Sequence, residues 1–107
     1  PEMSYRPAVC ALFIGLMGFA GTAAASPELA QKKTCMACHT VDKKVLGPGF
    51  KEVAAKYAGD KTAADKLATK ILKGGSGVWG NAAMPPMAAT VTEAEAKQLS
   101  TWILGLK

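Results

Sequence analysis

The sequence predicts an all-α domain of about four helices, and three observations lead to this prediction. Apolar residues recur at helical spacing in several stretches after residue 26. These stretches are bounded by glycine, by proline or by a threonine with a glutamate three positions later, all of which are common at helix ends. No stretch alternates apolar and polar residues as a half-buried strand does, and the sequence contains no internal repeat.

A chain of 107 residues with 50% hydrophobic content supports one domain and is too short for two. Much of the hydrophobic content lies in one uncharged block, Ala8–Ala20, which Arg6 precedes and Ala23–Ala25 follow. This order of positive, apolar and small residues is typical of a secretory signal peptide. Residues 1–25 are therefore expected to be removed on export to the periplasm, and residues 26–107 to form the mature domain.

A transmembrane anchor and a buried helix of the domain are the competing interpretations of this block. Its apolar run is about 13 residues, whereas crossing a bilayer takes roughly 20. No basic cluster follows the run directly. Cys10 lies inside the block and is expected to be removed with it, while Pro1 and Glu2 are interpreted as residues from expression or from an upstream start.

Two helices are expected in the first half of the mature chain. The first begins at Pro27, since proline and a following acid favour a helix start, and it runs into Cys35. The segment Gly47-Pro48-Gly49 interrupts regular structure. The second helix is expected over Phe50–Tyr57 and ends at Gly59.

Two more helices are expected in the second half. The third covers Ala63–Lys73 and is stopped by Gly74-Gly75, after which residues 74–87 form a loop without periodicity. The last helix follows a capping box, Thr92-Glu93-Ala94-Glu95, which marks a helix N-terminus. Its apolar stripe consists of Ala96, Leu99, Ile103 and Leu106, with Trp102 beside it.

The strongest chemical signal is Cys35-Met36-Ala37-Cys38-His39, which has the C-x-x-C-H spacing of a c-type haem attachment site. In a nearly helical segment, Cys35 and Cys38 lie on one side. They can form thioethers to the two haem vinyl groups, while His39 turns its ring toward the iron. The motif therefore predicts one covalently bound haem c with an axial imidazole.

Three other interpretations of the two cysteines are weaker. A structural zinc site takes four cysteine and histidine ligands, but the mature chain offers only three. A thioredoxin-like dithiol belongs in a βαβ context, which the sequence lacks, and it leaves His39 unexplained. A plain disulfide is expected only as a transient state before haem attachment.

The second axial position of the iron has several candidates, because His39 is the only histidine. Methionine, lysine, water and an empty site remain, and methionine fits best. Met84 lies in the long loop, and Pro85-Pro86 fix the backbone behind it. Met87 is the alternative ligand and is otherwise core filler, while Met36 is expected either to fill the core or to contact the haem edge.

From Glu28 to Lys107 the chain resembles the short bacterial class I cytochromes c of the c-551/c-552 type. The resemblance lies in four motifs that occur in the order of that family: Cys35-Met36-Ala37-Cys38-His39, Val45-Leu46-Gly47-Pro48-Gly49, Gly77-Val78-Trp79-Gly80 and Met84-Pro85-Pro86. It implies that residues 26–107 adopt the cytochrome c fold, with about four helices around one covalently bound haem.

The resemblance also implies roles for individual residues. His39 is the proximal iron ligand, and its outer ring nitrogen is hydrogen-bonded to the carbonyl of Pro48, which fixes the tautomer. Met84 is the distal ligand. Trp79 donates its indole N–H to a buried haem propionate, and Lys70 lies near the same propionate; the alternatives are a plain core tryptophan and a solvated lysine.

These features predict a periplasmic one-electron carrier, and not an enzyme, because filled axial positions leave no place for a substrate. The alternative is a haem enzyme or a gas-binding haem protein with an open distal site. The mature chain keeps the formal charge of +5, since Arg6 and Glu2 are lost together.

Lysines spread along helices are expected to favour weak contacts with acidic redox proteins, and not nucleic acid. A monomer without stable membrane insertion is expected. The lysines placed in the encounter patch, which is otherwise an ordinary solvated surface, are Lys32, Lys33, Lys43 and Lys44.

Overall fold

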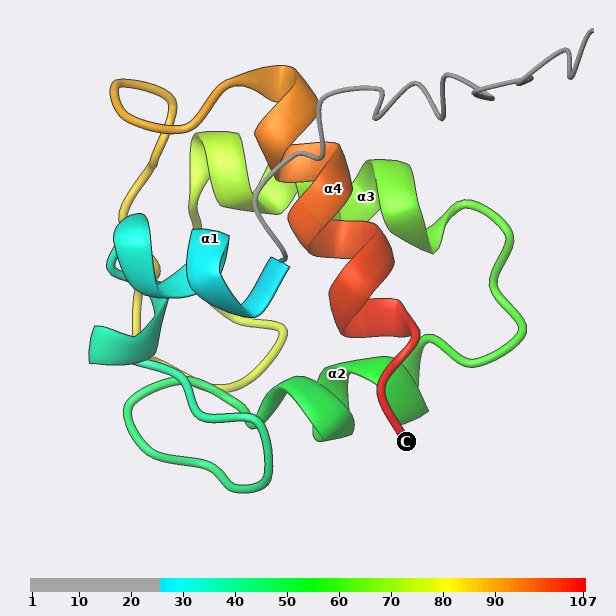
Figure 1. Cartoon of the computed structure of the whole chain (residues 1–107). Helices are drawn as coiled ribbons and strands as arrows, with labels where there is room; N and C mark the ends of the chain where they lie inside the picture. Colours follow the sequence, from blue (N-terminus) through cyan, green and yellow to red (C-terminus); the bar gives the residue numbers. More distant parts are fainter. Residues whose placement is uncertain (1–25) are drawn as a thin grey trace, which may run out of the picture.

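The computed structural model describes residues 26–107, and the expected signal peptide, residues 1–25, lies outside them. The described part is all-α, as the sequence predicts, and it contains no strand beyond an isolated bridge between Gly75 and Met84. Its elements, in chain order and coloured in Figure 1, are α1 (Ser26–Lys32), the short 3₁₀ helix η1 (Cys35–Ala37), α2 (Phe50–Lys56), α3 (Ala63–Lys73) and α4 (Glu93–Leu104).

Helix α3 and the start of α4 lie where predicted, but α4 ends at Leu104, so Leu106 of the predicted stripe lies beyond the helix. Helix α3 covers Ala63–Lys73 and ends at Gly74. The capping box of α4 is present: the Thr92 hydroxyl oxygen accepts from the Glu95 N–H at 3.1 Å, and the Glu95 carboxylate accepts from the Thr92 N–H at 3.0 Å. Both bonds satisfy amide groups that a helix N-terminus leaves without partners.

The first half differs from the prediction in two places. Helix α1 starts at Ser26 and ends at Lys32, so it does not continue into the cysteine motif. Thr34 has a left-handed backbone (φ 63°, ψ 17°), which ends the helical path before η1 begins. Helix α2 ends at Lys56, one residue before the expected Tyr57, since Tyr57 already has the backbone of a C-cap.

Helix α4 packs against all three other α-helices and forms the centre of the fold (Figure 1). Two groups of buried side chains flank it. One lies where α1, α3 and α4 meet, and the other lies where α2 meets α4. The first group contains Leu29, Ala30, Ala68, Ile71, Val91, Ala96 and Leu99, and the second contains Phe50, Val53 and Ile103.

The cysteine motif is packed onto both of these groups. Cys35 and Met36, which are partly buried, contact side chains of each group, and Trp102 of α4 does the same. The Trp102 ring meets the Phe50 ring edge to face, with 5.5 Å between the ring centres. The cysteine motif therefore packs against the core where its two groups of buried side chains meet.

Within residues 26–107, no helix combines the length and the apolar character that crossing a membrane requires.

Candidate functional site

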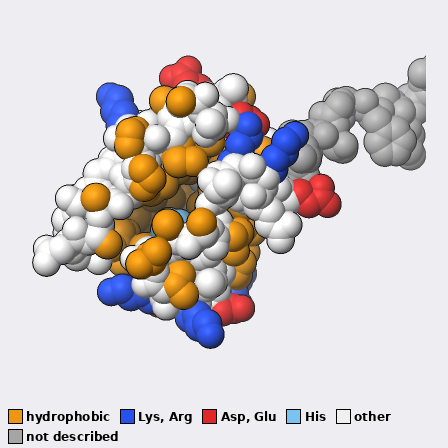
Figure 2. Space-filling model, turned by 90° about the vertical axis from the view of Figure 1, so that its left-hand side faces the viewer, with side chains coloured by type: hydrophobic (Ala, Val, Ile, Leu, Met, Phe, Trp, Pro, Cys, Tyr) orange, Lys and Arg blue, Asp and Glu red, His pale blue; other side chains and the backbone are white. Residues whose placement is uncertain are grey.

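A cleft of about 250 Å³ opens on one face of the molecule. Residues from η1, from the following loop, from α3 and from the loop after α3 line it. Figure 2 shows hydrophobic side chains gathered around its mouth, the single histidine inside it and lysines at the periphery. The lining brings together two thiols, an imidazole and a thioether, from Cys35, Cys38, His39 and Met84.

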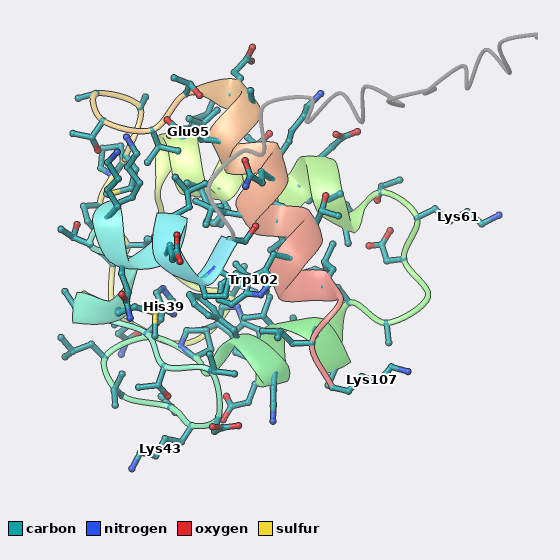
Figure 3. The ribbon with its side chains drawn as sticks, in the orientation of Figure 1. His39, Lys43, Lys61, Glu95, Trp102 and Lys107 are labelled. Carbon is teal, nitrogen blue, oxygen red and sulfur yellow. The ribbon has the colours of Figure 1, made fainter. Side chains whose placement is uncertain are left out.

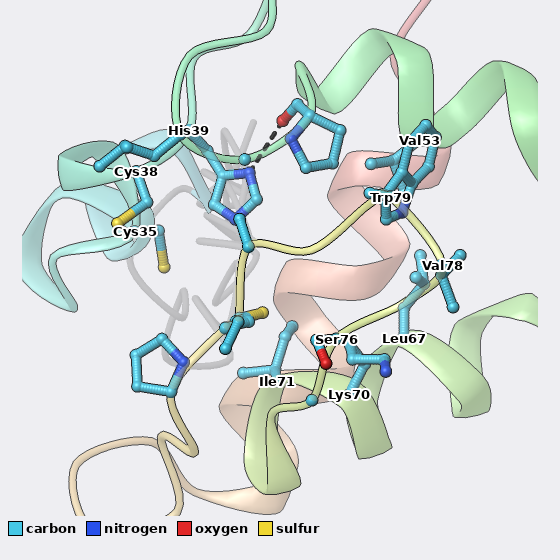
Figure 4. A pocket seen from close by; sticks show the side chains of 18 of the residues that line it. Cys35, Cys38, His39, Val53, Leu67, Lys70, Ile71, Ser76, Val78 and Trp79 are labelled. Atoms are coloured by element: carbon cyan, nitrogen blue, oxygen red, sulfur yellow. Dashed lines mark hydrogen bonds between the residues drawn. The ribbon is translucent and has the colours of Figure 1, made fainter.

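The two thiols lie at one end of this cleft (Figure 4). In a 3₁₀ helix, side chains three residues apart eclipse one another, and η1 thereby turns Cys35 and Cys38 to the same side. Both cysteines are free thiols and not a disulfide. Burial raises the pKa of the Cys35 thiol, so this sulfur is a neutral thiol at neutral pH.

His39 is held by what we call the histidine segment, residues 38–50. Its Nδ1 lies 2.8 Å from the carbonyl oxygen of Pro48, which makes Nδ1 the protonated nitrogen and leaves the lone pair on Nε2 (Figure 4). The imidazole stacks on Phe50, with ring centres 5.0 Å apart and an angle of 22° between the planes. A Cβ at Gly47 would lie 2.5 Å from Cε1 of the ring, so Gly47 leaves room for the imidazole.

The backbone of the histidine segment is tied on both sides of the ligand. The Gly47 N–H donates to the Cys38 carbonyl at 2.7 Å, and the Phe50 N–H donates to the Thr40 carbonyl at 2.9 Å. These bonds close the loop on the two neighbours of His39. The ring therefore has a fixed orientation before any metal is considered.

Met84 belongs to what we call the methionine segment, residues 74–88. Gly75 and Met84 form an isolated antiparallel pair, with N–H···O distances of 3.0 and 2.8 Å. Met84 lines the cleft, whereas Met87 and Met36 lie outside its lining and pack against the core. The geometry therefore favours Met84 over Met87 as the thioether that shares the cleft with the imidazole.

Trp79 lies at the end of the cleft away from the two thiols (Figure 4). Its side chain is 36% exposed, which disagrees with a plain core tryptophan. The ammonium group of Lys56 lies over the indole ring at 5.4 Å, a cation–π contact. Sequence reasoning missed Lys56, because nothing in the pattern links α2 to a loop that begins some twenty positions later.

Lys70 of α3 also lines the cleft, and its ammonium group lies 2.9 Å from the position that a Cβ on Gly75 would take. Lys70 thus brings a basic group into the cleft from α3, and Lys56 places a second one over the Trp79 ring from α2. A negatively charged group placed there would be paired and not left as a bare charge. This arrangement fits the acidic edge of a porphyrin.

One lysine of the expected encounter patch, Lys33, makes contacts with other residues of the protein. The ammonium group of Lys33 donates to the Thr90 carbonyl at 2.7 Å and lies 3.4 Å from the Glu95 carboxylate. Lys32, Lys43 and Lys44 are exposed, and Figure 3 shows Lys43 pointing away from the body of the protein. The Lys33 amine therefore closes the contact between α1 and the start of α4, while the encounter patch stays a prediction.

The chemistry of the donors agrees with haem and disagrees with a simple metal ion. Among residues 26–107, no group of three or more histidine, cysteine, aspartate or glutamate side chains is arranged to hold a metal. The cleft instead offers two neighbouring thiols, a nitrogen with a fixed tautomer, a thioether and apolar walls. These residues define a class of protein, a small helical domain built to hold a covalently attached haem.

Comparison with known proteins gives the family. A family model described as Cytochrome c matches residues 23–107. Cytochrome c-552 of Hydrogenobacter thermophilus is 54% identical over 96 residues, which cover 90% of this chain and 96% of that protein. Cytochrome c-551 of Pseudomonas aeruginosa is 47% identical over 88 residues, which cover 81% of this chain and 83% of that protein.

A solved structure agrees with the fold. The crystal structure of wild-type cytochrome c552 of Nitrosomonas europaea matches with a TM-score of 0.73 and 53% identity, over 76% of this chain and 99% of that chain. The chain belongs to the cytochrome c family, as its resemblance to the c-551/c-552 type predicts. It is a small electron-transfer protein whose cofactor is one covalently attached haem c with iron.

Proposed function

We propose that this protein is a periplasmic carrier of single electrons whose haem iron is bound by His39 and Met84. One observation carries the proposal: the imidazole of His39 and the thioether of Met84 line the same cleft as the two thiols of the attachment motif. Cys35 and Cys38 supply the thioether bonds that retain the haem. The two side chains then occupy both axial positions, which leaves no site for a substrate and supports a carrier and not an enzyme.

The surroundings of each ligand support its role. The Pro48 carbonyl fixes the His39 tautomer with Nε2 free, and a hydrogen bond of this kind also makes an imidazole a stronger donor to a metal. Haem bound by histidine and methionine has a raised reduction potential, because a thioether favours ferrous iron. Phe50, Val53 and Ile71 in the lining exclude water, which limits the rearrangement that accompanies a change of charge.

The Trp79 end of the cleft is proposed to receive a haem propionate. The indole N–H can only donate a hydrogen bond. Lys56 lies over the indole ring, and Lys70 brings a second positive charge into the cleft. A carboxylate bound there gains charge-assisted hydrogen bonds. In this assignment Lys56 acts on the propionate through the orientation of the Trp79 ring.

The surface at the mouth of the cleft is proposed to bind acidic redox proteins transiently. Val45 and Leu46 are 45% and 68% exposed beside the exposed Lys43 and Lys44. Apolar side chains at the cleft give a small contact area, and the lysines steer an acidic partner toward it. We place the mature protein, residues 26–107, in the periplasm as a monomer that binds neither nucleic acid nor membrane stably.

The test uses the purified haem protein and two methionine variants. A ferric haem–thioether bond gives a weak far-red absorption band, and a six-coordinate ferrous haem does not bind carbon monoxide. The wild type and Met87→Ala are expected to show the band and to resist carbon monoxide, whereas Met84→Ala loses the band and binds the gas. Rapid carbon monoxide binding by the wild type would instead support the gas-binding or enzymatic alternative.

A further inference from the structure

The methionine segment completes the C-terminal end of α3. The last four carbonyl groups of an α-helix have no partner within the helix. Here the Lys70 carbonyl accepts from the Gly74 N–H at 2.7 Å. The Ile71 carbonyl accepts from Met87 at 3.0 Å, and the Leu72 carbonyl accepts from Ala88 at 3.3 Å. The helix end and the methionine segment therefore depend on each other for their hydrogen bonds.

The backbone of Met84 is fixed between these contacts. Its N–H donates to the Gly75 carbonyl at 2.8 Å, and its carbonyl accepts from the Gly75 N–H at 3.0 Å. Both backbone polar groups of Met84 are thus hydrogen-bonded to Gly75. Since the position of the α-carbon limits where a side chain can reach, this pair sets the place of the Met84 thioether in the cleft.

Gly74 lies at the point where the two backbones approach most closely. Its φ of 68° and ψ of −159° belong to a region that only glycine adopts readily. A Cβ built on Gly74 would lie 2.8 Å from Pro85 C and 2.8 Å from Pro86 N, and it would also collide with the Met84 carbonyl oxygen. All three contacts are with backbone atoms, which cannot rotate away as a side chain does.

The two prolines decide how such a collision would be relieved. Proline fixes φ, and it also restricts the residue before it. The stretch Met84-Pro85-Pro86 therefore cannot bend locally around a methyl group. It has to move away from α3 as a unit, and the Met84 side chain moves with it.

We infer that Gly74 is a positioning residue for the methionine ligand: its bare α-carbon lets Met84-Pro85-Pro86 lie against the end of α3, which presents the sulfur to the iron. The inference rests on the proposed role of Met84 as the axial ligand. Gly74 does not line the cleft, and we infer that it acts through the backbone of Met84. In this role Gly74 determines where the Met84 sulfur lies. Any effect of Gly74 on the free energy of unfolding is distinct from that role.

The first test compares Gly74→Ala with Gly59→Ala in the haem-loaded protein. Gly59 has a φ of 80°, and no atom lies within 4 Å of the place where a methyl group would stand, so alanine there brings backbone strain without a collision. Gly74→Ala is expected to weaken the far-red band, to lower the reduction potential and to bind carbon monoxide. Gly59→Ala is expected to lower thermal stability while all three properties stay at their wild-type values.

The comparison separates the two proposals. A wild type without the far-red band would contradict the methionine ligation itself. A wild type with the band, together with a Gly74→Ala protein that keeps the band, the potential and the resistance to carbon monoxide, would overturn only the role of Gly74. Loss of these properties in both glycine variants would also overturn it, because backbone strain anywhere would then suffice.

A second measurement remains decisive if Gly74→Ala does not fold. Coupling between two contacts is reciprocal, so removing the sulfur has to loosen the backbone pair that presents it. In Met84→Ala, the amides of residues 75 and 84 are expected to exchange hydrogen about tenfold faster than in the wild type or more. The Gly47 amide, which is bound in the histidine segment, serves as the internal reference. Unchanged exchange at residues 75 and 84 would contradict the inference.

Discussion

The histidine segment and the methionine segment hold their proposed iron ligands by different means. In the histidine segment, contacts reach the ligand side chain itself: Pro48 binds the ring nitrogen at 2.8 Å and Phe50 stacks on the ring. In the methionine segment, the fixed bonds are those of the Met84 backbone to Gly75. The orientation of the imidazole is thus fixed by contacts of its own ring, whereas the thioether is positioned through the main chain.

The chemistry of the two side chains explains this difference. An imidazole has a second nitrogen that can donate a hydrogen bond while the first binds metal. A thioether is only a weak hydrogen-bond acceptor and is flexible about its three side-chain bonds. Backbone bonds and two prolines are therefore the means by which a chain can place a methionine sulfur. We therefore expect the methionine side of the proposed site to open more easily.

The largest effect is expected from removal of the imidazole. His39→Ala takes away the ligand beside the attachment cysteines, so exported protein is expected to accumulate without haem. Met84→Ala is expected to keep its covalent haem, because the thioether bonds and His39 remain. Haem staining of denatured protein on a gel, normalised to total chain by immunoblot, measures both. Equal staining of His39→Ala and wild type would show that the two segments are equivalent in haem retention.

Truncation of Phe50 tests the support of the imidazole. The side chain is 4% exposed and joins His39 to Trp102 through ring contacts, so Phe50→Ala is expected to lower the free energy of unfolding by about 3–5 kcal/mol. Phe50→Leu keeps most of the volume and is expected to lose less. Denaturant unfolding followed by circular dichroism gives both values. A loss below about 1 kcal/mol for the alanine variant would mean that the stacked ring adds little.

A smaller effect is expected beyond the methionine segment, where the chain enters α4. Thr92→Ala removes the hydroxyl that accepts from the Glu95 N–H, and it is expected to cost about 1 kcal/mol of unfolding free energy. Thr92→Ser keeps an oxygen in the same place and serves as the control. The midpoint of urea unfolding is the measurement, and identical midpoints for the two variants would argue against the cap as a source of stability.

The smallest effect is a loosening in acid of residues 90–92, which join the methionine segment to α4. The Glu95 pKa is lowered from its ordinary value of 4.5, first by the hydrogen bond from the Thr92 N–H and then by Lys33. A lowered folded-state pKa means that this carboxylate contributes fully to stability above 4.5 and loses its contribution as the pH falls through the lower folded-state value. Amides of residues 90–92 are then expected to exchange faster, an acid response that Glu95→Gln should remove.

Asp60, which lies outside both segments, is expected to make the stability of the domain depend on pH in acid. Its pKa is lowered to about 2, first by the Thr62 hydroxyl. Its contribution is present above its ordinary value of 3.8 and is lost as the pH falls toward 2. Asp60→Asn is therefore expected to change the acid sensitivity of the whole domain without a specific effect on exchange at residues 90–92. A specific effect there would mean that the acid response is not local to Glu95.

The sequence predicted well those features that depend on neighbours in the chain. Helix α3 and the cap of α4 have the predicted limits, because an apolar stripe, a pair of glycines and a capping box are local signals. The thiols and His39 share one cleft for the same reason, since one short motif contains them. Met84 was favoured from its loop and the two prolines behind it, whereas Trp79 and Lys70 came from resemblance to a family; the cleft lining includes all three.

The features that the sequence missed depend on distant contacts. Nothing in the sequence distinguishes Lys33 from a surface lysine until the fold brings Thr90 to its amine. The pairing of Gly75 with Met84 involves a single residue on each side, which leaves no periodicity to detect. No glycine or proline marks the break after α1. The break occurs at Thr34, which takes a backbone conformation that threonine disfavours, so the sequence does not predict it.

That conformation at Thr34 has a consequence for the chain before haem attachment. A left-handed backbone costs an L-residue roughly 1–2 kcal/mol, and here it falls directly before the first thiol. Glycine adopts this backbone without that cost, so we expect the strain at Thr34 to lower the stability of the folded haem-free chain. Thr34→Gly should resist protease longer before haem attachment and mature in higher yield, and the half-life of the haem-free form in a protease assay measures the gain.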